Sequence, residues 1–203
     1  MDPQQRIFLQ TLWRAMYDAG YKAADFSGTS AGIFVGVSTY DYFEIMRETA
    51  EGIEAHMSTG MSHCVLVNRV SYMLDTHGPS EPVDTACSSS LVAIHRAVQS
   101  IRSGECEIAF AGGVNALLTP GIFVSFSKAG MLAEDGRCKT FDERADGYVR
   151  GEGVGVVLLK ALHRAVADGD HIYGVIKGIA VNHGGSASSL TAQIGRASCR
   201  ERV

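Results

Sequence analysis

The 203-residue sequence predicts an α/β fold in which helices cover a mostly parallel sheet. Short apolar runs of the kind that form buried strands alternate along the chain with segments of helical periodicity. Strands joined by helices favour parallel pairing. Because no linker and no repeat of fixed period interrupts this alternation, we expect one domain or part of one.

The N-terminal segment predicts a helix followed by a buried strand. Asp2 is a capping carboxylate, and Pro3 suits the first helical position. Apolar residues then recur at helical spacing before Gly20: Leu9, Leu12, Trp13 and Met16. The apolar stretch at 33–37 is bounded by glycine and polar residues, which indicates a strand buried on both faces.

The rest of the chain continues the alternation. We expect helices at 41–49 and 62–74, a strand at 83–85, a helix from Ser90 and a strand at 108–111. A long connection at 115–146, rich in aromatic residues and turns, leads to a strand at 154–159. A short helix at 162–167, a turn at 168–170 and a strand at 172–181 follow.

Composition excludes several classes of function. The sequence is 46% hydrophobic and 20% charged, as in ordinary globular domains. The net charge is -4 and the 18 basic residues are scattered, so we expect no nucleic-acid partner and no anionic membrane surface. The apolar runs are too short to cross a bilayer, and the N-terminus has no signal-peptide core, which predicts a cytoplasmic protein.

Metal, disulfide and nucleotide sites are not expected. The five cysteines form no C-x-x-C pair, and the seven histidines are dispersed. The glycines at 147–155 precede a strand, whereas a phosphate-binding loop follows one. Four carboxylates are interleaved with Arg144 and Arg150, which favours a solvated or salt-bridged segment over acid/base catalysis: Asp142, Glu143, Asp146 and Glu152.

The strongest functional signal is Cys87, at the start of a predicted helix. Unpaired backbone N–H groups and the positive end of the helix dipole stabilise a thiolate there and raise its nucleophilicity. Its neighbours are small: Ala86, Ser88, Ser89 and Ser90. They leave room for a substrate carbonyl and for backbone amides that stabilise an oxyanion. The pattern predicts covalent acyl transfer through Cys87.

A lone cysteine more often serves as a small buried residue. Against this, a stripe at helical spacing predicts the buried face of the helix: Leu91, Ile94, His95, Val98 and Ile101. Cys87 precedes the stripe, at the turn that leads into the helix. Its position therefore favours the reactive interpretation.

Two histidines are candidate partners of Cys87. His183 would need a spatial contact that the sequence does not show. His95 lies about two turns into the same helix, roughly 12 Å from Cys87 at 1.5 Å per residue. We expect His95 to be a packed or capped side chain.

Five motifs in order resemble the β-ketoacyl synthase domain of modular bacterial polyketide synthases. They are Met1-Asp2-Pro3-Gln4-Gln5-Arg6, Val83-Asp84-Thr85-Ala86-Cys87-Ser88-Ser89-Ser90-Leu91, Ala111-Gly112-Gly113-Val114-Asn115, Gly136-Arg137-Cys138-Lys139-Thr140-Phe141-Asp142 and Gly147-Tyr148-Val149-Arg150-Gly151-Glu152-Gly153. The resemblance covers 1–192 as a partial domain, its N-terminal half. Residues 53–60 and 181–185 resemble the ketosynthases that a separate acyltransferase serves.

The resemblance implies a thiolase-like fold with layered α-β-α-β-α architecture, a buried nucleophile helix and a homodimer. It implies that Cys87 takes an acyl chain from the phosphopantetheine arm of an acyl carrier protein. A malonyl unit on a carrier protein then loses carbon dioxide and attacks the Cys87 thioester, which lengthens the chain by two carbons. No cofactor binds directly, and the other implied partners are further domains of a polyketide synthase.

The sequence also departs from the family. The family's two active-site histidines lie in downstream His-Gly-Thr-Gly-Thr and Asn-Ile-Gly-His motifs that this sequence does not contain, and His183 matches a different family position. The family also has a strand before the first helix, which this sequence lacks. Because a partial sheet leaves strand edges and apolar faces uncovered, we expect this chain by itself not to condense. Three alternatives stay open: a non-elongating ketosynthase that only transfers acyl chains, a non-catalytic subunit of a condensing dimer, and a cysteine hydrolase.

The last residues of the chain, 193–203, depart from the family pattern. After Ala192 the family continues with Pro-Asn, whereas 193–203 are rich in arginine, and 194–203 resemble a translated sequencing-library adapter. We expect 193–203 to be a non-native tail. Sequencing the parent locus should reveal a continuous Pro-Asn reading frame, and native DNA that encodes the same tail would contradict this expectation.

Overall fold

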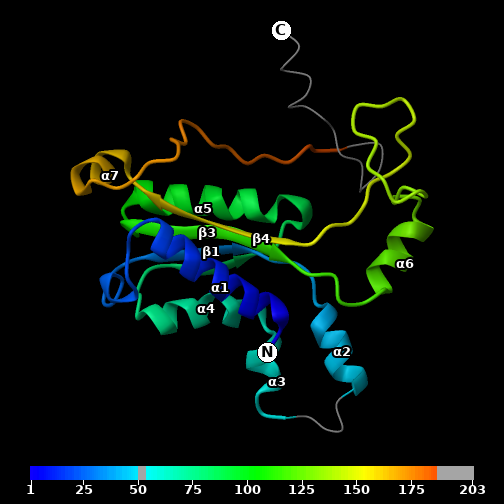
Figure 1. Cartoon of the computed structure of the whole chain (residues 1–203), viewed down its shortest axis with the longest axis horizontal. Helices are drawn as coiled ribbons and strands as arrows, with labels where there is room; N and C mark the ends of the chain where they lie inside the picture. Colours follow the sequence, from blue (N-terminus) through cyan, green and yellow to red (C-terminus); the bar gives the residue numbers. More distant parts are fainter. Residues whose placement is uncertain (50–53, 187–203) are drawn as a thin grey trace.

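A mixed four-stranded sheet organises the fold (Figure 1). The structure, a computed structural model, describes residues 1–49 and 54–186. The described strands lie in the order β2-β1-β3-β4: β1 (Gly32–Gly36), β2 (Ser80–Val83), β3 (Ile108–Asn115) and β4 (Gly153–Lys160). The first three are parallel to one another, and β4 pairs with β3 in antiparallel register. The expected α/β architecture with a mostly parallel sheet is confirmed.

Helices cover both faces of this sheet. α1 and α4 lie on one face and α5 lies on the other, whereas α2 and α6 follow the carboxyl ends of β1 and β3 (Figure 1). The helices are α1 (Pro3–Asp18), α2 (Asp41–Thr49), α3 (Met57–Met61), α4 (His63–Leu74), α5 (Ser89–Ser103), α6 (Gly121–Lys128) and α7 (Leu162–Asp168). Short 3₁₀ turns occupy Ala23–Asp25 and Ala86–Ser88.

Alternation along β1 divides the core into two layers. Ile33 and Val35 pack with α1 and α4, whereas Phe34 packs on the opposite side against α5. All five residues of β1 are buried, as the apolar run predicts for a strand covered on both faces. The α5 side is built mainly from small residues, Ala93 and Ala97 among them. This composition lets α5 approach the sheet closely.

Two segments differ from their predictions. Residues 172–181, predicted as a strand, form no described strand and instead run from α7 outside the sheet, on the side of α5 (Figure 1). The prediction was wrong because apolar content does not supply a neighbouring strand with which to pair. Within the predicted connection at 115–146, α6 forms a helix. Its short, partly β-branched sequence gave no helical signal.

The turn predicted after α7 is confirmed. Gly169 follows the helix with a left-handed φ of 74°, which glycine adopts without strain. Lys160 of β4 donates to Asp170 at 2.7 Å and to the Tyr21 hydroxyl at 2.8 Å, and also contacts Asp168. Burial opposes the charge of Lys160, but these hydrogen bonds prevail and raise its pKa. The network fastens the turn to β4.

A buried glutamine network joins α1 to the carboxyl end of the sheet. The predicted cap is confirmed, because the side chain of Asp2 accepts from Gln4 N at 2.8 Å. Gln4 is 1% exposed, and its Oε1 accepts from Thr39 Oγ1 at 2.9 Å and from Ala116 N at 3.3 Å. Its Nε2 donates to Thr39 O at 3.2 Å, and His63 Nε2 lies 3.0 Å from the same oxygen. The network ties α1 and α4 to the two loops that follow β1 and β3.

Loss of the Gln4 side chain should destabilise the fold. Gln4→Ala leaves the Thr39 hydroxyl and the Ala116 N–H buried without their acceptor, so we expect the free energy of unfolding to fall by about 3 kcal/mol. Urea unfolding measures the change. Gln10→Ala, at an exposed position of the same helix, is the matched control. Equal losses in the two variants would contradict a structural role for the network.

Candidate active site

Cys87 lies in a tight turn between β2 and α5. It occupies the 3₁₀ turn Ala86–Ser88, and its thiol is exposed. Thr85 N donates to Ser89 Oγ at 2.9 Å, and Ser89 Oγ donates to Ala86 O at 2.6 Å. Ala86 has a left-handed φ of 51°, a conformation that costs a non-glycine residue on the order of 1–3 kcal/mol. The serine hydroxyls therefore close a strained turn that presents the cysteine.

Close backbone contact positions the helix that follows this turn. A Cβ on Gly36 would lie 2.5 Å from Ser90 N, and one on Gly113 would lie 2.8 Å from Ser90 Cβ. Because separations below 3 Å are not tolerated, β1 and β3 need glycine where α5 crosses them. The start of α5, and with it the Cys87 turn, is placed by this contact.

The predicted buried face of α5 was only partly correct, since Ile94 and Ile101 pack half-buried against the core but Leu91 does not. The buried residues are small: Ser89, Ala93, Ala97 and Ser100. Leu91 is 66% exposed, and His95 is half-buried. Since the helix backbone approaches the sheet so closely, small residues occupy the centre of the contact, and Ile94 and Ile101 pack half-buried against the same core cluster. The helix that follows the Cys87 turn is thus buried along its sheet-facing side.

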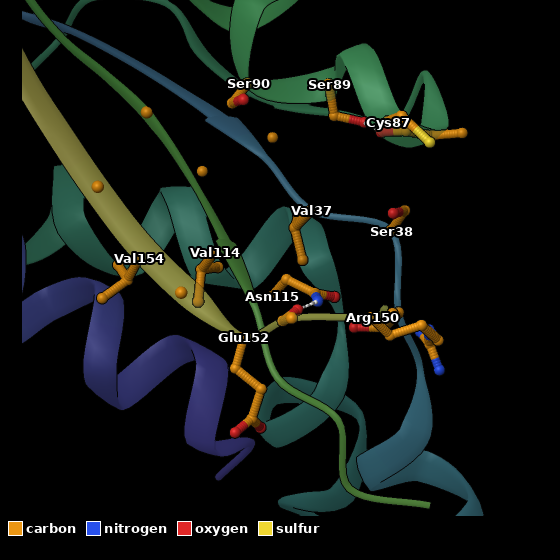
Figure 2. Close-up of a pocket in the computed structure, with 18 of the residues that line it drawn as sticks. Val37, Ser38, Cys87, Ser89, Ser90, Val114, Asn115, Arg150, Glu152 and Val154 are labelled. Atoms are coloured by element: carbon orange, nitrogen blue, oxygen red, sulfur yellow. Dashed lines mark hydrogen bonds between the residues drawn. The ribbon is translucent and has the colours of Figure 1, made fainter. Parts of the chain in front are cut away.

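Cys87 borders an open pocket of about 860 Å³ (Figure 2). The pocket lies at the carboxyl ends of the parallel strands, the usual place for ligands in α/β sheets. Ile122 and Phe126 of α6 line one side, and residues 148–157 line another. Across the pocket from Cys87, Asn115 Nδ2 donates to Gly151 O at 2.7 Å (Figure 2). The space and its apolar walls suit an extended apolar ligand.

Tyr148 lies near Cys87. Burial raises the pKa of Tyr148, Arg150 partly opposes this rise, and the electrostatic interaction with Cys87 adds to it. The Tyr148 ring also contacts Phe126 of α6, with ring centroids 6.5 Å apart. Sequence reasoning placed Tyr148 in a motif but gave no signal for this proximity, because 60 residues of chain separate it from the turn.

Arg150 connects the pocket-lining segment 148–157 to α6. Its guanidinium lies over Phe123 at 4.8 Å and over Phe126 at 5.4 Å from the ring centroids. Arg150 Nη1 is buried and has no hydrogen-bond partner among the described residues. Cation–π contacts of this kind contribute about 0.5–2 kcal/mol. Arg150 therefore helps to hold α6 against the pocket.

Neither candidate histidine meets Cys87. Of the residues described, those that line the pocket include neither His95 nor His183. His183 is exposed, and its Nδ1 accepts from Gly185 N at 2.9 Å. His95 Nδ1 is buried on α5 without a described partner. Within the described part of the chain, the structure brings no histidine to the thiol.

The other described cysteines have different surroundings. Cys106 is buried and donates to Ser100 Oγ at 3.3 Å, and burial raises the pKa of its thiol. Cys64 is exposed, and Cys138 accepts from Val149 N at 3.2 Å. Cys199 lies outside the described residues. No group of three metal-ligating side chains comes together in residues 1–49 and 54–186.

Three of the four interleaved carboxylates make structural contacts. Asp142 pairs with Arg144 at 2.8 Å, and Asp146 pairs with Lys139 at 2.6 Å, so the salt-bridged interpretation is confirmed for both. The hydrogen bond from Arg144 holds the pKa of Asp142 below its usual value. Glu152 differs, since it accepts from the backbone N–H of Leu117 at 2.8 Å.

Known proteins with similar sequences share one domain type. Residues 1–165 match the family described as β-ketoacyl synthase, N-terminal domain. Polyketide synthase PksN of Bacillus subtilis strain 168 is 53% identical over 191 residues, which are 94% of this chain and 4% of that protein. The 6-methylsalicylic acid synthase of Aspergillus niger is 47% identical over 197 residues, 97% of this chain and 11% of that protein. The chain thus spans a small part of these relatives.

Solved structures give the same result. The ketosynthase from module 6 of the bacillaene synthase of Bacillus subtilis 168 has a TM-score of 0.86 at 42% identity, over 95% of this chain and 32% of that chain. The oxazolomycin ketosynthase domain OzmH KS7 of Streptomyces albus JA3453 has a TM-score of 0.82 at 45% identity, over 93% of this chain and 33% of that chain.

These similarities establish the class of protein to which the chain belongs. The fold is the thiolase-like fold of ketosynthase domains, as the resemblance implied. More narrowly, the chain belongs to the β-ketoacyl synthase family and carries its N-terminal domain.

The glycine contact beneath α5 generates a prediction. Gly36→Ala forces the α5 backbone away from β1, so we expect the free energy of unfolding to fall by about 3 kcal/mol in urea titrations. Gly155→Ala in β4 is the control, because a Cβ there meets nothing within 4 Å. If both variants unfold at the same urea concentration, the contact does not position α5.

Proposed function

We propose that Cys87 is the acyl-accepting nucleophile of a β-ketoacyl synthase of polyketide biosynthesis. One observation carries the proposal: the Cys87 thiol is exposed in a strained turn at the edge of a pocket of about 860 Å³. By contrast, Cys106 is buried and bonded to Ser100. Among the described cysteines, Cys87 alone lines this pocket.

The first step would be transthioesterification. The Cys87 thiolate attacks the carbonyl carbon of an acyl group held on the phosphopantetheine arm of an acyl carrier protein. A bond forms to Cys87 Sγ, and the carbonyl–sulfur bond to phosphopantetheine breaks. The departing thiolate takes up a proton. The apolar pocket side chains Ile122 and Phe126 would cover the acyl chain once it is attached to Cys87.

The second step would be condensation. A malonyl unit on a carrier protein loses carbon dioxide, and its carbanion attacks the carbonyl carbon of the Cys87 thioester. The acyl–sulfur bond to Cys87 breaks and frees the Cys87 thiolate, so that phosphopantetheine keeps a chain longer by two carbons. Decarboxylation supplies the carbanion without a strong base. Family membership supports this step. No cofactor would be bound directly by the chain.

The proposed assembly is a homodimer within a larger synthase. β2 lies at an edge of the described sheet, and an unpaired strand edge invites pairing with a second chain. Acyl carrier protein and further polyketide synthase domains would be the other partners. We propose a cytoplasmic location. In the described residues, the helices are too short or too polar to cross a membrane.

Replacement of the nucleophile tests the proposal. We expect Cys87→Ala to abolish transfer of an acyl group from acyl carrier protein to the chain, because no thiol remains in the turn. Intact-protein mass spectrometry measures the adduct. Cys138→Ala, which removes another exposed thiol, should retain loading.

The lifetime of the Cys87 adduct distinguishes acyl transfer from hydrolysis. A thioester that persists on Cys87 supports acyl transfer, whereas rapid loss to water would indicate a cysteine hydrolase. Loading retained in Cys87→Ala would place the nucleophile elsewhere.

A further inference from the structure

The connection between β3 and α6 is held through its backbone. Four successive N–H groups of this connection donate to side chains from distant segments. Ala116 N donates to Gln4 Oε1 at 3.3 Å, and Leu117 N donates to Glu152 Oε1 at 2.8 Å. The N–H groups of Leu118 and Thr119 both donate to Asp41 Oδ2, at 2.9 and 3.1 Å. Three acceptors therefore hold the backbone N–H groups of residues 116–119, and Glu44 Oε2 also accepts from Thr119 Oγ1 at 2.9 Å.

These contacts matter because the connection leads directly into α6. Ile122 and Phe126 of that helix line the Cys87 pocket. None of the described residues of α6 is buried, so core packing does not fix the helix. Its position instead depends on how residues 116–119 are held and on the stacking of Arg150 over Phe123 and Phe126.

Of the three acceptors, Glu152 is the one that lies in the pocket-lining segment 148–157. It belongs to the pocket-lining segment that also carries Tyr148 and Arg150. Figure 2 shows its carboxylate pointing away from Cys87. The Leu117 N–H that it accepts comes from the connection to α6. Glu152 thus links the pocket segment that carries Tyr148 to the α6 wall.

We propose that Glu152 is a positioning residue, which fixes the α6 wall of the pocket by accepting the Leu117 N–H. The inference rests on the proposed function of Cys87 and extends it to the residues that shape the acyl pocket. Glu152 acts as a hydrogen-bond acceptor and takes no proton during the reaction. A glutamine, whose Oε1 accepts equally, should therefore replace it.

Amide hydrogen exchange tests the contact directly. In Glu152→Ala we expect faster deuterium uptake in peptides that contain 116–119, while peptides from the buried strand β1 stay protected. Glu152→Gln should retain the wild-type uptake. Glu134→Ala, which removes an exposed carboxylate from the loop after α6, is the control and should also leave this uptake unchanged.

Acylation supplies the functional test. With hexanoyl-N-acetylcysteamine as acyl donor, we expect Glu152→Ala to form the Cys87 thioester about tenfold more slowly, because a displaced wall misplaces the acyl chain. Glu152→Gln should stay within about twofold of wild type. If Glu152→Ala does not fold, Glu152→Asp, whose carboxylate is withdrawn by one methylene, replaces it with the same expectation.

Two results would overturn the inference: wild-type exchange at 116–119 in Glu152→Ala, or a Glu152→Gln variant as slow as Glu152→Ala. The second result would indicate that the charge is needed. Absence of any Cys87 thioester in the wild-type chain would instead count against the proposed function, and the exchange comparison would still decide the role of Glu152.

Discussion

The backbone of α5 touches the sheet at Ser90, and the position of Cys87 depends on this contact. Glycine at Gly36 and Gly113 removes the Cβ atoms that would collide with Ser90. The close approach in turn requires small residues such as Ala93 and Ala97 along the sheet-facing side of the helix. Because α5 is fixed at its first turn, the strained turn before it projects an exposed thiol at the carboxyl ends of the parallel strands.

A second set of contacts shapes the space that this thiol faces. Buried Gln4 joins the start of α1 to Thr39 and to Ala116, and Asp41 and Glu152 hold the next three amides. Motifs far apart in sequence therefore meet at one end of the sheet. Side chains that accept from backbone N–H groups hold irregular loops where no regular secondary structure does so. The pocket wall is consequently set by polar contacts.

Local signals predicted much of this structure, and non-local contacts account for what they missed. The Asp2 cap, the buried strand β1 and the turn that carries Cys87 each follow from a few adjacent residues. The small, buried residues of α5 did not, since they reflect glycines in two distant strands. Likewise, the partner of Glu152 lies 35 residues away in sequence. Residues 172–181 show the same limit, because a strand requires a neighbour as well as apolar residues.

The distribution of acyl groups among the thiols tests the account most directly. The chain would be treated with hexanoyl-N-acetylcysteamine, digested, and each cysteine-containing peptide quantified by mass spectrometry. The account predicts that Cys87 carries at least about ten times more acyl adduct than Cys64 or Cys138. Cys64 also lies in the first turn of a helix, but neither of those exposed thiols lines the pocket. Equal labelling of the three thiols would contradict it.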